Sequence, residues 1–388
     1  MYIIKLNIAH RKLWELFSSA YEYGGVCLSN YLKLVTIIGF AFVLVSCSGN
    51  SADRVKVTPP QENEVIHEDD FEAKLDQYMG KNFSGSVLLV KDNKVIVSKG
   101  YNMADYNNNL PNGPDTIHQI GSLTKAFTAA AILQLGEAGK LSVDDPVDTY
   151  IKDYPNHKIT LYHLLTHTSG IPNYTDFPDF INSINLKTSV NELIAKFKDM
   201  SLEFDPGSQF SYSNSGYVLL GAVIEQVSGQ SYSDYLNEHI FTPLGMKRSG
   251  YLTKGNIHTD IAVGYSFLTP DNAETALPID MSVPYSAGGI YSTVQDLYNW
   301  LLGLENGTII SSASWEAMRT PEMGEYALGW AVPGSKGKVY THNGAINGFS
   351  SEIWRDMSQG TAVILLSNAE GDLGHMRDVL LRMLDAEE

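Results

Sequence analysis

The chain has 388 residues, of which 44% are hydrophobic and 18% are charged, and its formal net charge at pH 7 is -17. Such a chain can bury a large core and has room for two or three domains, or for one α/β unit with an insertion. The negative charge, without any basic stripe, excludes nucleic-acid binding. No cysteine follows Cys47, which excludes a disulfide within the remaining sequence.

The first fifty residues carry the pattern of an export signal. An apolar run from Leu34 to Val45 follows Lys33 and is short for a membrane-spanning helix, as is typical of a signal peptide. The sequence Leu44-Val45-Ser46-Cys47 resembles the lipobox of bacterial lipoproteins, in which the cysteine is acylated and becomes the new N-terminus. We expect residues 1–46 to be an N-terminal extension and signal peptide, and Cys47 to be lipidated. The alternatives are an uncleaved anchor helix and a buried core segment.

Strands are predicted near both ends of the remaining chain. Residues 47–71 are polar and acidic and predict a tether. Short runs rich in β-branched residues then predict a hairpin, and two more strands and a final helix are predicted near the C-terminus. The strands are Ser86 to Val90, Val95 to Ser98, Ser350 to Trp354 and Thr361 to Leu366, and the helix runs from about Leu373 to Leu384.

The middle of the chain, from about residue 140 to 280, has helical stretches and loops rich in proline and glycine, with few convincing strands. The helical stretches are Leu161 to Thr166, Val190 to Phe197, Ser215 to Val227 and Asp234 to Ile240. Strands at both ends with helices between them predict an α+β fold. We expect an antiparallel β-sheet that the two ends of the chain complete, flanked by helices and carrying an all-α insertion subdomain.

An alanine-rich helix follows Ser122 and ends before Gly139. Lys125 contradicts the usual rules for a helix start, because a capping box would place Glu or Gln there and the helix dipole disfavours a cation. That dipole favours the neutral amine, and a neutral amine beside a serine can activate it as a nucleophile. The alternative is an ordinary N-cap serine with a solvated lysine. Ser335 and Lys338 share the spacing, but no apolar helix follows them.

Two further patterns mark a possible site. Tyr212-Ser213-Asn214 stands directly before a long apolar helix, where side chains can point into a cleft; the alternative for Asn214 is a helix N-cap. His342-Asn343-Gly344 falls where a strand should run antiparallel to Ser350 to Trp354, and a glycine within a strand often permits close approach of another backbone or a ligand. The alternative for His342 is an exposed edge histidine.

A metal site is not favoured. His163 and His167 are four residues apart, but His163 is followed by Leu164 rather than by the glutamate of a zinc protease, and the helix ends nearby. We therefore expect no metal ion and no cofactor.

Taken in order, Ser122-x-x-Lys125, Tyr212-x-Asn214 and His342-x-Gly344 resemble the three motifs of the serine β-lactamase and penicillin-binding-protein superfamily, in its class C-like branch. Residues 120–125, 164–170, 286–293 and 347–351 support the resemblance, which covers a domain of about residues 72–386 with its helical subdomain at about 140–280.

The resemblance also implies roles for the motif residues. Ser122 would attack a carbonyl, and Lys125 and Tyr212 would accept and relay its proton. Asn214, His342, Gly344 and Ala345 would bind the substrate, with the backbone N–H groups of Ser122 and Ala345 forming the oxyanion hole.

The third motif departs from the Lys-Thr-Gly of many β-lactamases. A histidine is mostly neutral near pH 7, so His342 should attract a substrate carboxylate less than lysine would. Similar His-x-Gly forms occur in family members that are D-alanyl carboxypeptidases, D-peptidases and esterases. We therefore expect an envelope serine hydrolase that acts on D-amino-acid peptides, esters or amides, or on peptidoglycan-derived substrates. The alternatives are a true class C-like β-lactamase and a non-hydrolysing muropeptide- or β-lactam-binding protein.

The first testable prediction concerns export. If Cys47 is acylated, the protein should fractionate with membranes of the bacterial envelope, at the outer membrane or the periplasmic face, and Cys47→Ala should release it or block its processing. Mass spectrometry of the N-terminus checks this, and an unmodified Cys47 still preceded by Ser46 would contradict it.

Overall fold

The computed structural model describes residues 68–155, 158–251, 260–269, 272–334 and 337–386. The predicted signal peptide, Cys47 and the tether up to residue 67 lie outside these residues. Within them, no helix is long and apolar enough to cross a membrane. Residues 68–71, which the sequence assigned to the tether, are helical because Phe71, Leu75 and Met79 are spaced by four and are buried on one helix face.

The bounds of the elements are as follows. The helices are α2 (Glu68–Asn82), α3 (Thr124–Glu137), α4 (Leu161–Leu165), α5 (Phe180–Ser183), α6 (Val190–Ala195), α7 (Asn214–Ser228), α8 (Tyr232–Leu236), α9 (Tyr285–Gly288), α10 (Val294–Glu305), α11 (Ser312–Met318) and α12 (Gly374–Asp385). The strands are β1 (Gly85–Lys91), β2 (Lys94–Tyr101), β3 (Met103–Asp105), β4 (Leu110–Pro111), β5 (His118–Gln119), β6 (Gly250–Tyr251), β7 (Tyr265–Thr269), β8 (Asn272–Thr275), β9 (Ile290–Ser292), β10 (Val339–Ile346), β11 (Phe349–Asp356) and β12 (Thr361–Ser367).

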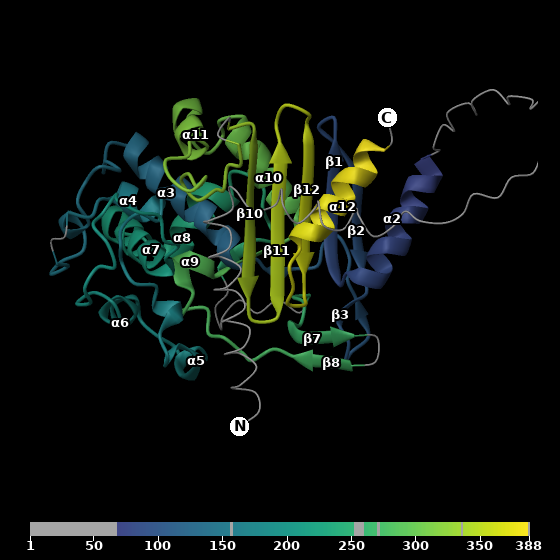
Figure 1. Cartoon of the computed structure of the whole chain (residues 1–388), viewed down its shortest axis with the longest axis horizontal. Helices are drawn as coiled ribbons and strands as arrows, with labels where there is room; N and C mark the ends of the chain where they lie inside the picture. The colour runs from purple at the N-terminus through teal and green to yellow at the C-terminus, as the bar shows by residue number, and fades with distance from the viewer. Residues whose placement is uncertain (1–67, 156–157, 252–259, 270–271, 335–336, 387–388) are drawn as a thin grey trace, which may run out of the picture. The chain divides into compact units, whose positions relative to one another are not determined.

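A five-stranded antiparallel sheet, in the order β10-β11-β12-β1-β2, runs through the middle of the described part of the chain (Figure 1). The predicted hairpin forms between β1 and β2, where Asp92 and Asn93 have positive φ angles, as a type I′ turn requires. Strand β12 pairs with β1, and Leu88 lies opposite Ile364. The two ends of the chain therefore complete one sheet, as the sequence predicted.

Successive side chains of β1 point to opposite faces of the sheet and join two different cores. Val87 and Leu89 pack with apolar residues of α2 and α12, whereas Leu88 and Val90 belong to the larger core that includes α3 and α10. Because both faces are covered, these strands are nearly continuously apolar (Figure 1).

The helical part is shorter than predicted. Helices α4, α6, α7 and α8 lie near their expected positions, and α5 was not predicted. The all-α assignment of residues 140–280 is wrong beyond residue 249. Strand β6 joins a small sheet with β5 and β9, and β7 and β8 form a hairpin. These strands have two to five residues and little apolar alternation, so the sequence carried no clear period-2 signal for them.

Helix α3 is fixed in the core by an aromatic stack. The rings of Phe127 on α3 and Trp300 on α10 lie with their centroids 4.1 Å apart at 19°, and both side chains are fully buried. Leu123 and all apolar side chains of α3 from Ala126 to Leu135 belong to the larger core. This packing holds the first turn of α3 in a fixed position beneath the sheet edge.

Candidate active site

Ser122 lies in a 3-10 turn, Gly121–Leu123, that leads directly into α3. Its hydroxyl caps neither helix, so the N-cap interpretation is wrong. Gly121 has a φ of +51°, and a Cβ there would lie 2.8 Å from the carbonyl oxygen of Ala345. Glycine is therefore needed for this backbone to approach β10 closely.

Lys125 is fully buried one helical turn after Ser122. Its Nζ lies 3.1 Å from Ser122 Oγ, 2.7 Å from Asn214 Oδ1 and 2.8 Å from the carbonyl oxygen of Ala287. Burial lowers the pKa of Lys125 well below its ordinary value. The sequence predicted a neutral Lys125 from the dipole at the helix start, but the structure attributes its lowered pKa to desolvation.

The contacts of Lys125 fix the direction of its hydrogen bonds. A neutral amine has two N–H donors and one lone pair. The Asn214 amide nitrogen donates to Thr175 Oγ1 at 3.2 Å, so the Asn214 atom that faces the lysine is its oxygen Oδ1. Carbonyl oxygens can only accept, so Asn214 Oδ1 and the backbone oxygen of Ala287 each accept one N–H of the amine. Both donors are then occupied, and the lone pair faces the Ser122 hydroxyl. Asn214 is the first residue of α7 and makes no capping hydrogen bond, so the N-cap alternative is wrong here as well.

Tyr212 borders the same hydroxyl from the other side. It precedes α7, as predicted, and its ring centroid lies 4.8 Å from Lys125 Nζ. Burial raises the pKa of the Tyr212 phenol, and a hydrogen bond with Ser122 partly opposes this shift. The structure therefore brings together the two motifs that the sequence singled out on separate helices.

The third motif lies on β10, which pairs antiparallel with β11 as predicted. A Cβ at Gly344 would lie 2.1 Å from the carbonyl oxygen of Ile120 and 3.1 Å from the backbone nitrogen of Ser122. A Cβ at Gly121 would lie 2.9 Å from the backbone nitrogen of Ala345. The two glycines thus let the backbone around Ser122 and the backbone around Ala345 approach each other closely.

His342 is on an edge strand but is buried, so the exposed-histidine alternative is wrong. Its Nδ1 donates to the carbonyl oxygen of Asn343 at 2.6 Å, and its Nε2 accepts from the hydroxyl of Tyr326 at 2.9 Å. Burial lowers the pKa of His342 to about 4, and the hydrogen bond to Asn343 opposes this shift only in part. The ring is therefore neutral near pH 7, with both nitrogens already bonded.

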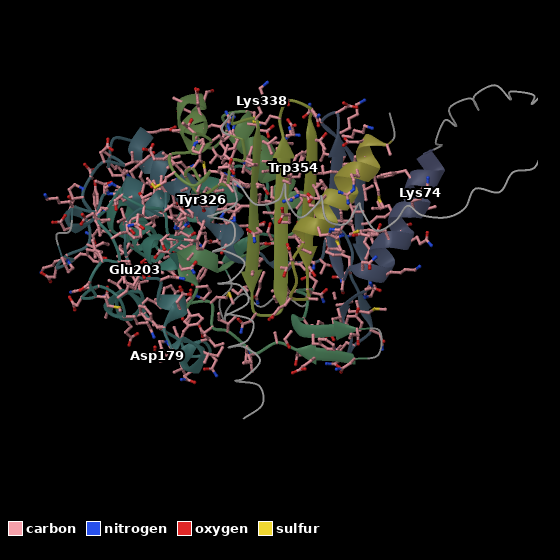
Figure 2. All side chains as sticks on the ribbon, viewed as in Figure 1. Lys74, Asp179, Glu203, Tyr326, Lys338 and Trp354 are labelled. Atoms are coloured by element: carbon pink, nitrogen blue, oxygen red, sulfur yellow. The ribbon has the colours of Figure 1, made fainter. Side chains whose placement is uncertain are left out.

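Tyr326 is a polar residue of this site that the sequence analysis missed, and the charged side chains of Glu352, Asp372 and Arg377 in the same cleft are others. The position of Tyr326 depends on isolated backbone pairings, in which Tyr326 lies opposite Ala331 and Ala331 lies opposite Thr341 on β10. Figure 2 shows Tyr326 beside the β10 edge of the sheet. Two such short pairings produce no periodic pattern of apolar residues in the sequence. The neighbouring glycines favour the prediction of a loop there.

The two histidines considered for a metal site have separate partners. His163 Nδ1 accepts the backbone N–H of Thr160 at the start of α4. His167 has a φ of +58°, accepts the backbone N–H of Ser213 at 3.1 Å, and its ring centroid lies 4.2 Å from that of Tyr212. Across the described ranges, no group of three or more metal-ligating side chains is gathered. His167 instead supports the Tyr212 ring.

Two cavities meet at Ser122 and Ala345. One cavity, of about 480 Å³, is lined by Tyr212 of the second motif and His342 of the third. The other, of about 210 Å³, contains Asn214. All seven predicted residues of the folded domain therefore lie at or beside one cleft. The lining of the larger cavity also includes Tyr326, Ala331, Thr341, Asn343, Glu352, Asp372, Gly374 and Arg377, and that of the smaller one includes Tyr174, Thr175, Phe180, Ile279, Pro284, Ala287, Gly288, Ile346 and Asn347.

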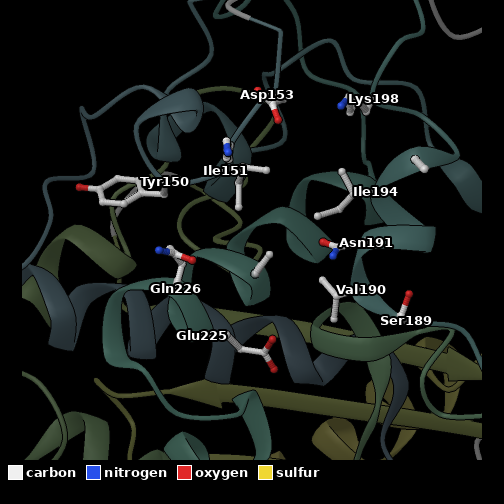
Figure 3. A pocket seen from close by; sticks show the side chains of 13 residues that line it. Tyr150, Ile151, Asp153, Ser189, Val190, Asn191, Ile194, Lys198, Glu225 and Gln226 are labelled. Atoms are coloured by element: carbon white, nitrogen blue, oxygen red, sulfur yellow. The ribbon is translucent and has the colours of Figure 1, made fainter.

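A larger hollow, of about 740 Å³, lies in the helical part between α6, α7 and residues 150–153 (Figure 3). Its labelled side chains include Glu225 and Gln226 of α7 and Asn191 of α6. None of the predicted catalytic or binding residues lines it. Size alone therefore does not identify the reactive site, and the cleft at Ser122 is the one with convergent polar chemistry.

The depressed pKa of His342 predicts a pH-dependent stability. The unfolded chain binds the proton with a pKa near 6.5, but the native ring binds it only near 4, so the unfolded state holds more protons between these values. The free energy of unfolding should therefore fall as pH falls through this window. In urea titrations at pH 7 and pH 5, His342→Gln should lose less stability than the unmodified protein, by on the order of 2 kcal/mol.

The matched control is His375→Gln, which replaces an exposed histidine of α12. This variant should follow the unmodified protein at both pH values. An equal loss of stability in the two variants would contradict a neutral, buried His342.

Comparison with known proteins agrees with this arrangement. The pattern of the family described as Beta-lactamase matches residues 71–388. The Bacillus subtilis protein PbpX is 34% identical over 351 residues, which are 88% of this chain and 86% of that one. The solved structure of a penicillin binding protein from Bacillus halodurans superimposes with a TM-score of 0.70 at 27% identity, covering 81% of this chain and 98% of that one.

A second similar solved structure is that of an enzyme. It is the D-amino acid amidase from Ochrobactrum anthropi SV3, solved with D-phenylalanine, with a TM-score of 0.69, 25% identity, and coverage of 81% of this chain and 97% of that one. Since the family pattern spans the whole described domain and the cleft gathers that family's three motifs, the chain belongs to the β-lactamase and penicillin-binding-protein family and is a serine hydrolase.

Proposed function

We propose that this protein is a lipid-anchored hydrolase of the bacterial cell envelope that forms an acyl-enzyme at Ser122 on D-amino-acid peptides, esters or amides. The observation that carries the proposal is the 3.1 Å contact between Ser122 Oγ and the buried Nζ of Lys125. Similarity to a D-amino acid amidase supports the D-amide substrates. The anchor rests on the lipobox at Cys47, outside the described residues.

Acylation follows from the direction of the hydrogen bonds. Ser122 Oγ attacks the carbonyl carbon while Lys125 Nζ takes its proton, because the amine lone pair faces that hydroxyl. The developing oxyanion would lie between the backbone N–H groups of Ser122 and Ala345, and removing one such donor typically costs about 3 to 4 kcal/mol. Tyr212, which contacts Ser122, relays the proton to the leaving group.

Deacylation uses the same groups in reverse order. A water molecule takes the place of the leaving group, gives its proton to the Tyr212–Lys125 pair, and attacks the ester carbonyl. The bond to Ser122 Oγ then breaks, and the serine regains its proton. Asn214 holds Lys125 Nζ at 2.7 Å and also lines the smaller cavity, so it keeps the amine in place and borders the bound acyl group.

Ser122→Ala should abolish covalent labelling by a fluorophosphonate or a fluorescent penicillin and leave the fold intact, since the change removes one oxygen that caps no helix. Gel fluorescence measures the label, and circular dichroism checks the fold. Ser335→Ala is the control, because Ser335 has the same spacing to Lys338 but no apolar helix follows it in the sequence. Label that persists on the Ser122 variant, or that disappears from the control, would identify another serine as the nucleophile.

Turnover decides between a hydrolase and a non-hydrolysing binding protein. Both would be acylated, but only the hydrolase releases product in amounts that exceed the enzyme concentration. A burst of one equivalent without later release would favour the binding protein.

The neutral ring of His342 favours esters over carboxylate-bearing lactams. At neutral pH, short-chain nitrophenyl esters should be hydrolysed better than penicillins or cephalosporins. His342→Lys should shift the preference toward substrates with a carboxylate, since one charge-assisted hydrogen bond is worth roughly 1.5 to 3 kcal/mol.

The measurement is kcat/KM on nitrophenyl esters, a chromogenic cephalosporin and a D-Ala-D-Ala peptide, for both proteins. Efficient cephalosporin hydrolysis by the unmodified protein with negligible esterase activity would make it a class C-like β-lactamase.

A further inference from the structure

The two cavities that meet at Ser122 differ in chemical character. The smaller one is lined mainly by apolar side chains, among them Tyr174, Phe180 and Ile279, and we call it the apolar half. The larger one contains Glu352, Asp372 and Arg377, and we call it the charged half. A substrate that reacts at Ser122 therefore places one of its two ends in each half.

The proton path indicates which end lies in the charged half. In the proposed mechanism Tyr212 passes the proton to the leaving group, so the leaving group must lie beside the Tyr212 hydroxyl. Tyr212 lines the charged half, whereas Asn214 lines the apolar half. The leaving group therefore occupies the charged half.

Among the described residues that line the charged half, the one cation, Arg377, already forms ion pairs. Arg377 Nη1 donates to Glu352 Oε1 at 2.6 Å, and Nη2 and Nε donate to Asp378 Oδ1 at 2.8 and 3.0 Å. Glu352 is buried on β11, and Thr341 Oγ1 also donates to its Oε1 at 3.3 Å. The guanidinium thus lies between two carboxylates, which offset its charge.

Asp372 adds a further negative charge. Its carboxylate is exposed and accepts the backbone N–H of Gly374 at 2.9 Å, and no ion pair to it occurs among the described side chains. The lining of the charged half therefore carries two carboxylates against one guanidinium. The third-motif lysine that would add a cation in many β-lactamases is replaced by the neutral, doubly bonded His342.

We propose that the charged half selects leaving groups that carry a positive charge, such as an ammonium-bearing amine or alcohol, over leaving groups that carry a carboxylate. This inference rests on the proposed function, because it assigns the leaving-group end from the acylation step. It makes Asp372 a specificity-determining residue. The apolar half accepts the acyl group, and the complete substrate class is an apolar acyl group joined to a cationic leaving group.

The test uses three phosphonate esters with the same alkyl group on phosphorus. They expel 3-(aminomethyl)phenol, 3-methylphenol or 3-(carboxymethyl)phenol, which differ mainly in charge. Ser122 Oγ bonds to phosphorus, the bond from phosphorus to the aryl oxygen breaks, and the departing phenolate takes the serine proton through Lys125 and Tyr212. The readouts are phenol release and the mass of the adduct, so no deacylation is required.

After correction for the rates of reaction with hydroxide, the cationic probe should react about tenfold faster than the anionic probe. The ratio should approach one in 1 M salt, where the Debye length is about 3 Å. Asp372→Asn retains the oxygen that accepts from Gly374 and should lower the ratio by about threefold. Asp385→Asn, the same charge change at the far end of α12, is the matched control and should leave the ratio unchanged.

The outcomes separate the two proposals. An adduct on Ser122 that forms as fast or faster with the anionic probe would overturn the inference and would assign Arg377 to carboxylate binding. An equal response of the Asp372 and Asp385 variants would overturn the role of Asp372. If no probe labels Ser122, the proposed function itself fails.

Discussion

The site depends on one amine that is removed from water without a counter-ion. Among the described residues, the hydrogen-bond partners of Lys125 Nζ are three uncharged oxygens, those of Ser122, Asn214 and Ala287. Transferring an ammonium into such surroundings is costly, and the chain avoids that cost when the lysine gives up its proton. The stacked core around α3 prevents the side chain from reaching solvent, so packing energy maintains the reactive state of the amine.

Local patterns carried most of what the sequence could predict. The β1–β2 hairpin, the final helix and the three motifs depend on spacing within a few residues, and each lies near its expected position. The resemblance to a family then supplied the order in which distant motifs meet. Gly121 and Gly344 both approach a facing backbone closely. The sequence indicated this only for Gly344, because a glycine within a strand is unusual.

Long-range contacts could not be predicted in the same way. Tyr326 reaches His342 through two isolated backbone pairings, and Arg377 reaches Glu352 across the space between a helix and a strand. Neither contact has a period in the sequence. The prediction also missed the short strands β6 to β8. Their register is fixed by the segments with which they pair rather than by an alternation of apolar residues within them. The contacts to which we attribute substrate preference are thus those that the sequence predicts least well.

The pairing of β1 with β12 has a consequence for how the protein acquires its activity. Strand β12 follows every other strand of the central sheet in the sequence, and β10, which borders Ser122, is also synthesised well after that serine. Ser122 and Lys125 are therefore synthesised well before the strand that borders them in the folded domain. Pairing between such distant segments is slow to form, because a large loop must close first. An unfinished or C-terminally shortened chain would thus be chemically silent, and hydrolysis would begin only once the whole domain has folded.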